Sequence, residues 1–318
     1  MRLYDWAGLT LASELDLPEL YPAVTEQAAA EIWTASVIEG RPPLLAPRRW
    51  FHRWRLPDGQ RWLSFAGYPG GYLLRFHGLA DFEVRHDRRE ILGYPRADTP
   101  ANTFTHLLLD QVLPLTIDTR RRLALHASVV NAGGRAAAFM GATGQGKSTL
   151  AAAFARRGYG VLSDDCCVIE RSEAGFDVVP TYPGLRLFPE TIAALFERPL
   201  SAPLRVAHYS RKQRVAPASP ETVRAPRVPL RGLYTFAPRE DAAAAIDPGI
   251  RRRSSREGVL DVIGSTFYLD VREQRRVRDG FELAAEVVSS CPVRLLTLPW
   301  NLSALDSAVD AIIDDLTR

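Results

Sequence analysis

The sequence contains few of the features that indicate a secreted, membrane-bound or zinc-binding protein. Its 318 residues include three cysteines, and no cysteine–histidine spacing typical of zinc occurs. Cys166 and Cys167 are neighbours, which rarely bridge, so no disulfide framework is indicated. No run of about 18 apolar residues is present, and the N-terminal residues lack the apolar core of a signal peptide. We therefore expect a cytoplasmic protein without a membrane span.

Lysine is also scarce, and its scarcity makes the lysines that remain informative. Of the 40 basic residues, only Lys147 and Lys212 are lysines, which leaves 38 arginines. The formal net charge of +3 is too small to indicate a nucleic acid or a membrane surface as partner. A lysine kept in an arginine-dominated chain indicates a position where a compact point charge matters.

The chain is long enough for two domains, and its texture changes near residue 118. Residues 1–118 hold five of the six tryptophans, and residues 50–65 predict a hairpin. Helices are expected over residues 25–38, which are rich in alanine, and over residues 103–117, ending near Pro114. We expect this region to be a β-rich α+β domain, with acceptor recognition as its candidate role.

Residues 119–318 predict an α/β catalytic domain. Residues 198–229 are rich in proline and arginine and predict a long irregular excursion, and residues 251–256 predict a solvated basic loop. The strands that we expect lie at residues 123–131, 136–141, 159–165, 231–238 and 292–300.

A glycine-rich stretch, GATGQGKS, fits the phosphate-loop pattern G-x-x-x-x-G-K-[ST]. Glycines let backbone N–H groups approach phosphate oxygens, and the start of the following helix favours an anion. In such loops the lysine contacts phosphates and the serine hydroxyl contacts Mg²⁺. The sequence therefore predicts a site for ATP and Mg²⁺. Its candidate residues are Gly141, Ala142, Thr143, Gly144, Gln145, Gly146, Lys147, Ser148 and Thr149.

Two adjacent carboxylates, Asp164 and Asp165, end the next expected strand. If that strand neighbours the loop strand in parallel, both acids emerge at the edge of the sheet that holds the phosphates. Alternation along a strand then points one acid towards a metal and the other towards an acceptor. Two carboxylates this close raise one pKa, which suits a base. In a plain ATPase the same pair would be a metal ligand and a solvated neighbour.

In their order and spacing these residues resemble the C-terminal catalytic domain of HPr kinase/phosphorylase over about residues 120–190. The shared features are His126 on the strand before the loop, the loop itself, a helix ending in ARRG, and the acid pair. The segment 182–190, YPGLRLFPE, resembles stand-alone members, some of which phosphorylate a serine of lasso peptide precursors. The resemblance implies an α/β P-loop kinase domain of the HPr kinase/PEP-carboxykinase type.

The resemblance also implies roles for individual residues. Asp164 and Asp165 would supply a metal ligand and the base; which does which stays open, and Ser148 with Asp165 are the candidate metal ligands. His126 would support the base or the phosphoryl group. Two further candidates for phosphate or acceptor contacts are Arg186 and Lys212, the latter in a segment that a solvated loop would explain equally well. The family has a further acid, later in the chain, that helps to hold the metal. This sequence has no clear match for it, and Glu190 is only a weak substitute.

Three functions are compatible with this pattern. The first is a serine/threonine kinase acting on a peptide or small protein, plausibly a lasso-type precursor, because a phosphate loop, Mg²⁺ and one base suffice for that reaction. The second is a nucleotide-binding regulator or ATPase, although no ABC-type signature and no NKxD guanine-reading motif occur. The third is a small-metabolite kinase. The resemblance also implies a homo-oligomer.

Overall fold

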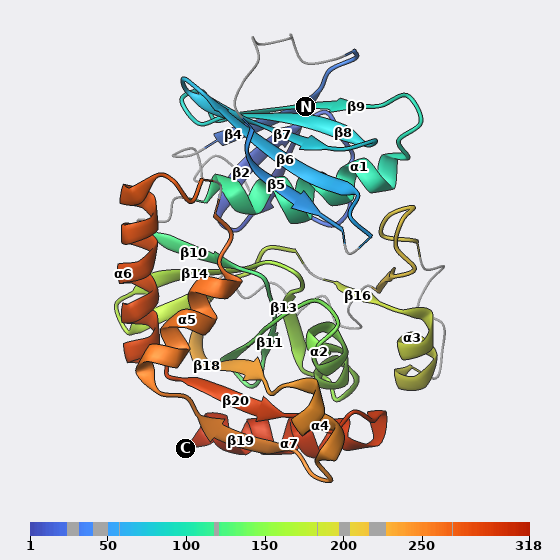
Figure 1. Cartoon of the computed structure of the whole chain (residues 1–318). Coiled ribbons are helices and arrows are strands. Elements are labelled where there is room, and N and C mark those ends of the chain that lie inside the picture. The colour runs from blue at the N-terminus through green and yellow to red at the C-terminus, as the bar shows by residue number, and fades with distance from the viewer. Residues whose placement is uncertain are drawn as a thin grey trace. The chain divides into compact units, whose positions relative to one another are not determined.

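The computed structural model describes the chain except for residues 24–31, 41–49, 57, 118–120, 183, 197–203, 216–226 and 269. It divides into two units (Figure 1). The first comprises Met1–Thr116 and Val206–Ser210, and the second comprises Ile117–Arg205 and Arg211–Arg318. No described helix combines the length and the apolar character that crossing a membrane requires.

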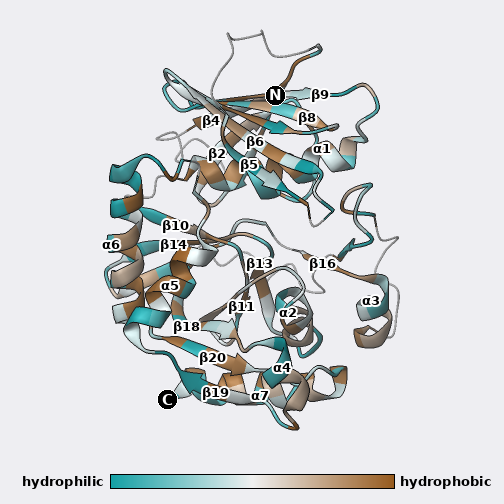
Figure 2. Ribbon diagram, in the orientation of Figure 1, coloured by the Kyte–Doolittle hydropathy of each residue, from teal (hydrophilic) through white to brown (hydrophobic). Residues whose placement is uncertain are grey.

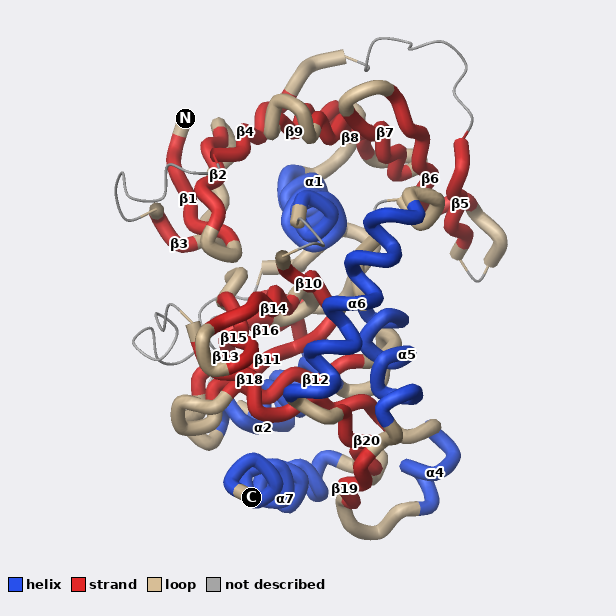
Figure 3. The backbone as a smooth tube through the Cα atoms, turned by 90° about the vertical axis from the view of Figure 1, so that its left-hand side faces the viewer, coloured by secondary structure: helices blue, strands red, loops and turns tan. Residues whose placement is uncertain are grey.

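The first unit is built on a nine-stranded sheet in the order β3-β1-β2-β4-β9-β8-β7-β6-β5. The pairs β2–β4 and β4–β9 are parallel, and the other pairs are antiparallel. The sheet curves around helix α1 (Figure 3). Its strands are β1 (Arg2–Trp6), β2 (Leu9–Ser13), β3 (Tyr21–Pro22), β4 (Ile32–Val37), β5 (Trp50–Arg55), β6 (Arg61–Tyr68), β7 (Gly71–Phe76), β8 (Ala80–Arg85) and β9 (Glu90–Pro95).

The predicted hairpin is confirmed, because β5 and β6 pair antiparallel across residues 56–60. The predicted helix over residues 25–38 is wrong where it can be compared: residues 32–37 form β4, and residues 24–31 lie outside the described part. Alanine content favoured a helix there. Pairing with β2 on one side and β9 on the other overrides that local preference, as often happens for strands.

The helix predicted over residues 103–117 is confirmed as a helix, but its α-helical part ends earlier than expected, at Leu107. Helix α1 (Ala101–Leu107) passes into a π-helical turn, Leu108–Val112, and then into a 3₁₀ turn, Leu113–Thr116. Phe104 of α1 stacks on Phe82 of β8, with ring centroids 5.0 Å apart. This apolar contact holds α1 against the sheet.

The second unit has a mixed sheet in the order β10-β14-β15-β18-β12-β11-β13, with β20 paired to β18 and β19 paired to β20. A separate pair joins β16 (Leu185–Leu187) to β17 (Gln213–Val215). Of these two strands only β17 lies in the excursion expected over residues 198–229, so that segment is not irregular throughout. The sheet strands are β10 (Arg122–Leu125), β11 (Ala127–Asn131), β12 (Ala136–Met140), β13 (Gly160–Ser163), β14 (Cys167–Ser172), β15 (Gly175–Val179), β18 (Val228–Phe236), β19 (Gly249–Arg252) and β20 (Val293–Thr297).

Helices pack on both faces of this sheet, so β12 is buried along its whole length. Ala138 and Met140 of β12 join the core beneath α5 and α6, whereas Ala137 and Phe139 join the core beneath α2 and α7. This alternation gives each helix pair its own apolar layer. In Figure 2, α6 carries both hydrophilic and hydrophobic residues, as expected of a helix with one buried face. The helices are α2 (Lys147–Arg156), α3 (Pro189–Leu195), α4 (Arg239–Ala244), α5 (Ser255–Ser265), α6 (Gln274–Ser290) and α7 (Leu305–Thr317).

Strand β12, which precedes the glycine-rich loop, and strand β13, which precedes Asp164 and Asp165, run in the same direction but are not neighbours. Strand β11 lies between them and pairs antiparallel with both β12 and β13. The carboxyl ends of β12 and β13 therefore still meet at one edge of the sheet. The expected parallel direction is confirmed, and the direct contact between the two strands is not found.

Two further predictions need correction. The strand expected over residues 123–131 is broken at His126, because β10 pairs with β14 while β11 pairs with β12 and β13. The backbone N–H of His126 donates instead to the carbonyl of Ser265 (2.7 Å). Residues 251–256 are not a loop: β19 ends at Arg252, and Ser254 caps α5 in a capping box with Glu257.

The contact between α7 and the sheet can be tested at Gly232 of β18. A Cβ at this position would lie 2.7 Å from Cδ2 of Leu316 and 2.5 Å from Cε2 of Tyr234. We expect Gly232→Ala to lower the free energy of unfolding by about 1–3 kcal/mol, because overpacking forces side chains off their rotamers. Urea unfolding followed by circular dichroism measures this. Gly264→Ala in α5 is the matched control, because a Cβ there meets no atom within 4 Å. Equal urea midpoints for the two variants would contradict the packing.

Candidate functional site

The loop between β12 and α2 is folded back on itself. Gly141 has a φ of 141°, and Gly146, the N-cap of α2, has a φ of 94°; both values favour glycine. The side-chain oxygen of Gln145 accepts a hydrogen bond from the backbone N–H of Ala142 (2.7 Å) and closes the loop. A Cβ at Gly141 would lie 2.2 Å from that oxygen, so the closed form requires glycine.

Lys147, the first residue of α2, is buried against the loop. Its ammonium group donates hydrogen bonds to the carbonyls of Gly141 (2.7 Å) and Ala142 (3.0 Å). Burial lowers the pKa of Lys147, and the nearby charge of Asp165 acts in the opposite direction. The loop therefore holds a partly desolvated cation, which interacts strongly with an anion because little water screens it.

Asp164 joins three elements through one buried carboxylate. Its Oδ1 accepts hydrogen bonds from the hydroxyls of Ser128 (2.5 Å) and Ser148 (2.9 Å), and its Oδ2 accepts from the backbone N–H of Arg186 (2.8 Å). These donors belong to β11, α2 and β16. Burial raises the pKa of Asp164, and the charge of Asp165 raises it further. This carboxylate therefore ties Ser148, at the start of α2, to Ser128 of β11 and Arg186 of β16.

Asp165 has a different environment from its neighbour. Its backbone is left-handed, with a φ of 65°, a conformation that is strained for most residues other than glycine and better tolerated by Asp and Asn. Its side chain is 16% exposed and lines a cavity, whereas Asp164 is fully buried. Nε of Arg186 lies 3.9 Å from its Oδ2. Of the two acids, Asp165 is the one that a ligand in the cavity can reach.

Arg186 is itself buried and held in place. Its guanidinium lies over the ring of Tyr182, 4.4 Å from the centroid, and Nη1 donates to the carbonyl of Asp164 (3.3 Å). The guanidinium is therefore a fixed positive charge beside the carboxylate of Asp165.

His126 faces the same cavity from the break between β10 and β11. Its Nδ1 lies 3.2 Å from the backbone carbonyl of Asp165, so a proton on Nδ1 donates to that oxygen. Burial lowers the pKa of His126, and the positive charge of Lys147 lowers it further. The imidazole is therefore neutral at pH 7, and it braces the strained backbone of Asp165.

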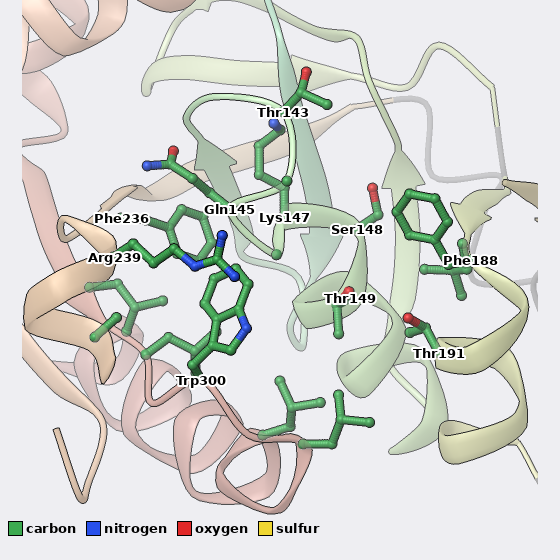
Figure 4. Close-up of a pocket in the computed structure, with 18 of the residues that line it drawn as sticks. Thr143, Gln145, Lys147, Ser148, Thr149, Phe188, Thr191, Phe236, Arg239 and Trp300 are labelled. Carbon is green, nitrogen blue, oxygen red and sulfur yellow. The ribbon is translucent and has the colours of Figure 1, made fainter. Parts of the chain in front are cut away.

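One cavity of about 540 Å³, a size typical of small-molecule sites, is lined by His126, Lys147, Asp165 and Arg186. Figure 4 shows part of its lining. One end is charged, and the other is apolar apart from Arg239. The charged end contains His126, Lys147, Asp165, Arg186 and Lys212. The apolar end contains Phe236, Ala237, Leu296, Leu298, Pro299, Trp300, Leu302 and Leu305.

The structure brings most of the sequence-predicted residues together. The cavity wall includes Thr143, Gly144, Gln145, Gly146, Lys147, Ser148, Thr149, His126, Asp165, Arg186 and Lys212. Asp164 lies directly behind Ser148, and Gly141 and Ala142 lie at the base of the loop without lining the cavity. Glu190 is exposed and pairs with Arg211. Among the described residues, no group of three His, Cys, Asp or Glu side chains is arranged to hold a metal.

Several residues that line the cavity were not predicted from the sequence. Phe188 follows β16 and Thr191 lies in α3. Phe236 ends β18, Arg239 begins α4, and Trp300 follows β20. One signal was available: β18 is parallel to β12 and β20 is parallel to β18, so their carboxyl ends share an edge with the loop. This shared edge can be inferred only when the order of the strands is known, and no local sequence motif contains that order.

Comparison with known proteins finds similarity among solved structures but no matching family model or curated protein. Among solved structures, the HPr(Ser) kinase/phosphatase from Coxiella burnetii is similar at 9% identity and a TM-score of 0.34. The match covers 61% of this chain and 99% of that chain. At that identity and TM-score, the likeness does not establish an activity.

The different environments of the two acids lead to a test of stability. We expect Asp164→Asn to lower the free energy of unfolding by about 1–3 kcal/mol, because an amide in place of Oδ1 or Oδ2 leaves a buried donor without its acceptor. Asp165→Asn is the matched control and should cost less than about 1 kcal/mol, since Asn also tolerates a positive φ. Thermal and urea unfolding of both variants measure the difference. An equal loss of stability would contradict the role given to Asp164.

Proposed function

We propose that the protein is an ATP-dependent phosphotransferase that transfers the terminal phosphoryl group of a nucleoside triphosphate to a hydroxyl group. One observation carries this proposal: the hydrogen bond of 2.9 Å from Ser148 to Asp164 joins the glycine-rich loop to the acid pair, and Asp165 lines the same cavity as Lys147. In fold terms, we assign the second unit to the P-loop kinases of the HPr kinase/PEP-carboxykinase type.

The residues present fit a polyphosphate. The closed loop that Gly141 and Gly146 allow leads into the start of α2, where unpaired backbone N–H groups favour an anion. Lys147 adds a desolvated cation at the same point, and the 540 Å³ cavity is large enough for a small ligand. The phosphate chain would lie along residues 143–149.

The donor set also fits Mg²⁺, which prefers oxygen ligands and keeps several water molecules. Ser148 would contribute its hydroxyl, and Asp164, already in hydrogen-bond contact with that hydroxyl, would contribute a carboxylate oxygen. When bound, the metal ion neutralises charge that develops on the transferred group. Because Mg²⁺ uses one or two carboxylates and phosphate oxygens, a larger cluster of acids is not required.

Asp165 is our candidate for the base, because it is the acid that reaches the cavity. In the proposed reaction the acceptor oxygen forms a bond to the γ-phosphorus while its proton passes to Asp165. The bond between the γ-phosphorus and the β–γ bridging oxygen breaks, and ADP departs with that electron pair. Arg186 and His126 hold Asp165 in position through its carboxylate and its backbone carbonyl.

Lys212 is our candidate for a second cation at the terminal phosphate. It and Lys147 are the two lysines of the sequence, and both line the same cavity. Its Nζ lies 5.9 Å from the ring centroid of Phe188, and its charge lowers the pKa of both Lys147 and His126. Its place in the cavity lining and these effects support a role for its ammonium group at the charged end.

For the acceptor we propose a serine or threonine hydroxyl of a peptide or small protein, with a lasso-type precursor as the first candidate. Its support is the resemblance of the motifs between residues 120 and 190. Incubation with labelled ATP and candidate peptides, followed by phosphoamino acid analysis, separates this acceptor from a small metabolite. ATP hydrolysis without transfer to any acceptor would favour the ATPase alternative.

The assignment of the base predicts a specific kinetic defect. We expect Asp165→Asn to lower kcat by about 10²–10⁴-fold while ADP binding is retained, because a base acts on the chemical step and not on nucleotide affinity. Phosphoryl-transfer assays and calorimetric titration with ADP measure the two quantities. Asp247→Asn, at an exposed position that does not line the cavity, is the control. Full transfer by Asp165→Asn would refute the assignment.

The role proposed for Lys212 predicts a loss of phosphoryl transfer with little loss of ADP binding. We expect Lys212→Gln to reduce kcat/KM for phosphoryl transfer by about tenfold or more, because a cation at the terminal phosphate stabilises charge in the transition state. ADP affinity should change little, since ADP lacks that phosphate. Arg211→Gln, which alters the adjacent cation paired with Glu190, is the matched control. A proportionate loss of ADP binding would instead place Lys212 at the α- and β-phosphates.

A further inference from the structure

The apolar end of the cavity has no role in binding phosphates or in proton transfer. Leu298, Trp300 and Leu302 line it, and Leu305 closes it from the start of α7. Trp300 is 51% exposed and Leu302 is 45% exposed. Large apolar side chains that remain exposed beside a cavity indicate a surface that a ligand covers.

Within this end, Trp300 and Arg239 form a stacked pair. The guanidinium carbon of Arg239 lies 4.3 Å from the centroid of the Trp300 ring. Figure 4 shows the two side chains against each other, with Phe236 beside them, across the start of α2 from Phe188 and Thr191. A guanidinium and an indole stacked in this way present a planar, polarisable surface.

The backbone that carries Trp300 is well ordered by its own hydrogen bonds. The Oδ1 of Asn301 accepts from the backbone N–H of Ala304 (2.8 Å) and from the hydroxyl of Ser303 (2.7 Å). The backbone N–H of Asn301 donates to the carbonyl of Pro299 (2.8 Å). The indole therefore stands on a preformed turn between β20 and α7, which reduces the entropy lost when a ligand stacks on it.

We propose that the Arg239–Trp300 pair is the subsite for the base of the nucleotide, and that binding there is by stacking. This inference rests on the proposed function, because it takes the occupant of the charged end to be the phosphate chain of the same molecule. The occupant must then join an anionic tail to a flat apolar group across one cavity. A nucleoside di- or triphosphate has that chemistry.

The subsite should discriminate weakly between bases. Stacking tolerates any base because every base has a π-face. The Oδ1 of Asn301 already accepts two hydrogen bonds from its own turn, and the sequence has no guanine-reading NKxD motif. We therefore expect ADP and GDP to bind within about tenfold of each other.

Titration calorimetry with the full chain tests the subsite, with ADP, GDP and inorganic pyrophosphate as probes. Trp300→Ala should weaken ADP and GDP about tenfold or more, since base–aromatic stacking has an effect of this size, and should leave pyrophosphate binding unchanged. Trp300→Phe keeps an aromatic face and should retain most of the affinity. Trp54→Ala, on β5 of the first unit and 50% exposed, is the control matched for residue type and exposure.

The outcomes separate this inference from the proposed function. If pyrophosphate and ADP bind to the unaltered protein and Trp300→Ala binds ADP equally well, the stacking subsite is refuted and the phosphate site stands. If Trp300→Ala weakens pyrophosphate as much as ADP, the indole supports the loop and not a base, which also refutes the subsite. If the unaltered protein binds neither probe, both proposals fail.

Discussion

The buried carboxylate of Asp164 is the interaction on which the site depends. It accepts hydrogen bonds from Ser128, Ser148 and the backbone of Arg186, and so connects β11, α2 and β16. An ionised group without such donors would be too costly to bury. Because Asp164 is fully engaged, the next residue, Asp165, is left to face the cavity. Two adjacent and chemically identical residues thereby acquire different environments: Asp164 is buried against Ser148, and Asp165 faces the cavity.

The cavity combines two kinds of surface that suit the two parts of a nucleotide. At one end, cations are gathered where little water screens them, so their interaction with an anion is strong. At the other end, Trp300 and Leu302 remain exposed, and their burial beneath a flat ligand would be favourable. The parallel strands β12, β18 and β20 bring these surfaces together, because their carboxyl ends lie at one edge of the sheet.

Sequence patterns performed best where the determining contacts are local. The loop, the helix after it and the strand before the acids were expected at these places, because glycine positions and apolar periodicity determine them over a few residues. The strand was expected to include Asp164 and Asp165, but β13 ends at Ser163. Strand β4 was mistaken for part of a helix, because its partners β2 and β9 lie far away in the sequence. The break at His126 was missed for the same reason: β10 and β11 pair with different strands. The motif residues were brought together as expected. That Phe188, Phe236 and Trp300 line the same cavity was not predicted.

The sequence by itself determined the chemistry of the charged end: a glycine-rich loop, two acids, a histidine, and two lysines among arginines. These identities are read directly, because side-chain chemistry does not depend on the fold. Only the tertiary structure decided which acid is buried, that β11 separates β12 from β13, and that Arg239 and Trp300 stack in the same cavity as Lys147. Strand order and burial arise from contacts between residues far apart in the chain, and such contacts leave no local pattern in the sequence.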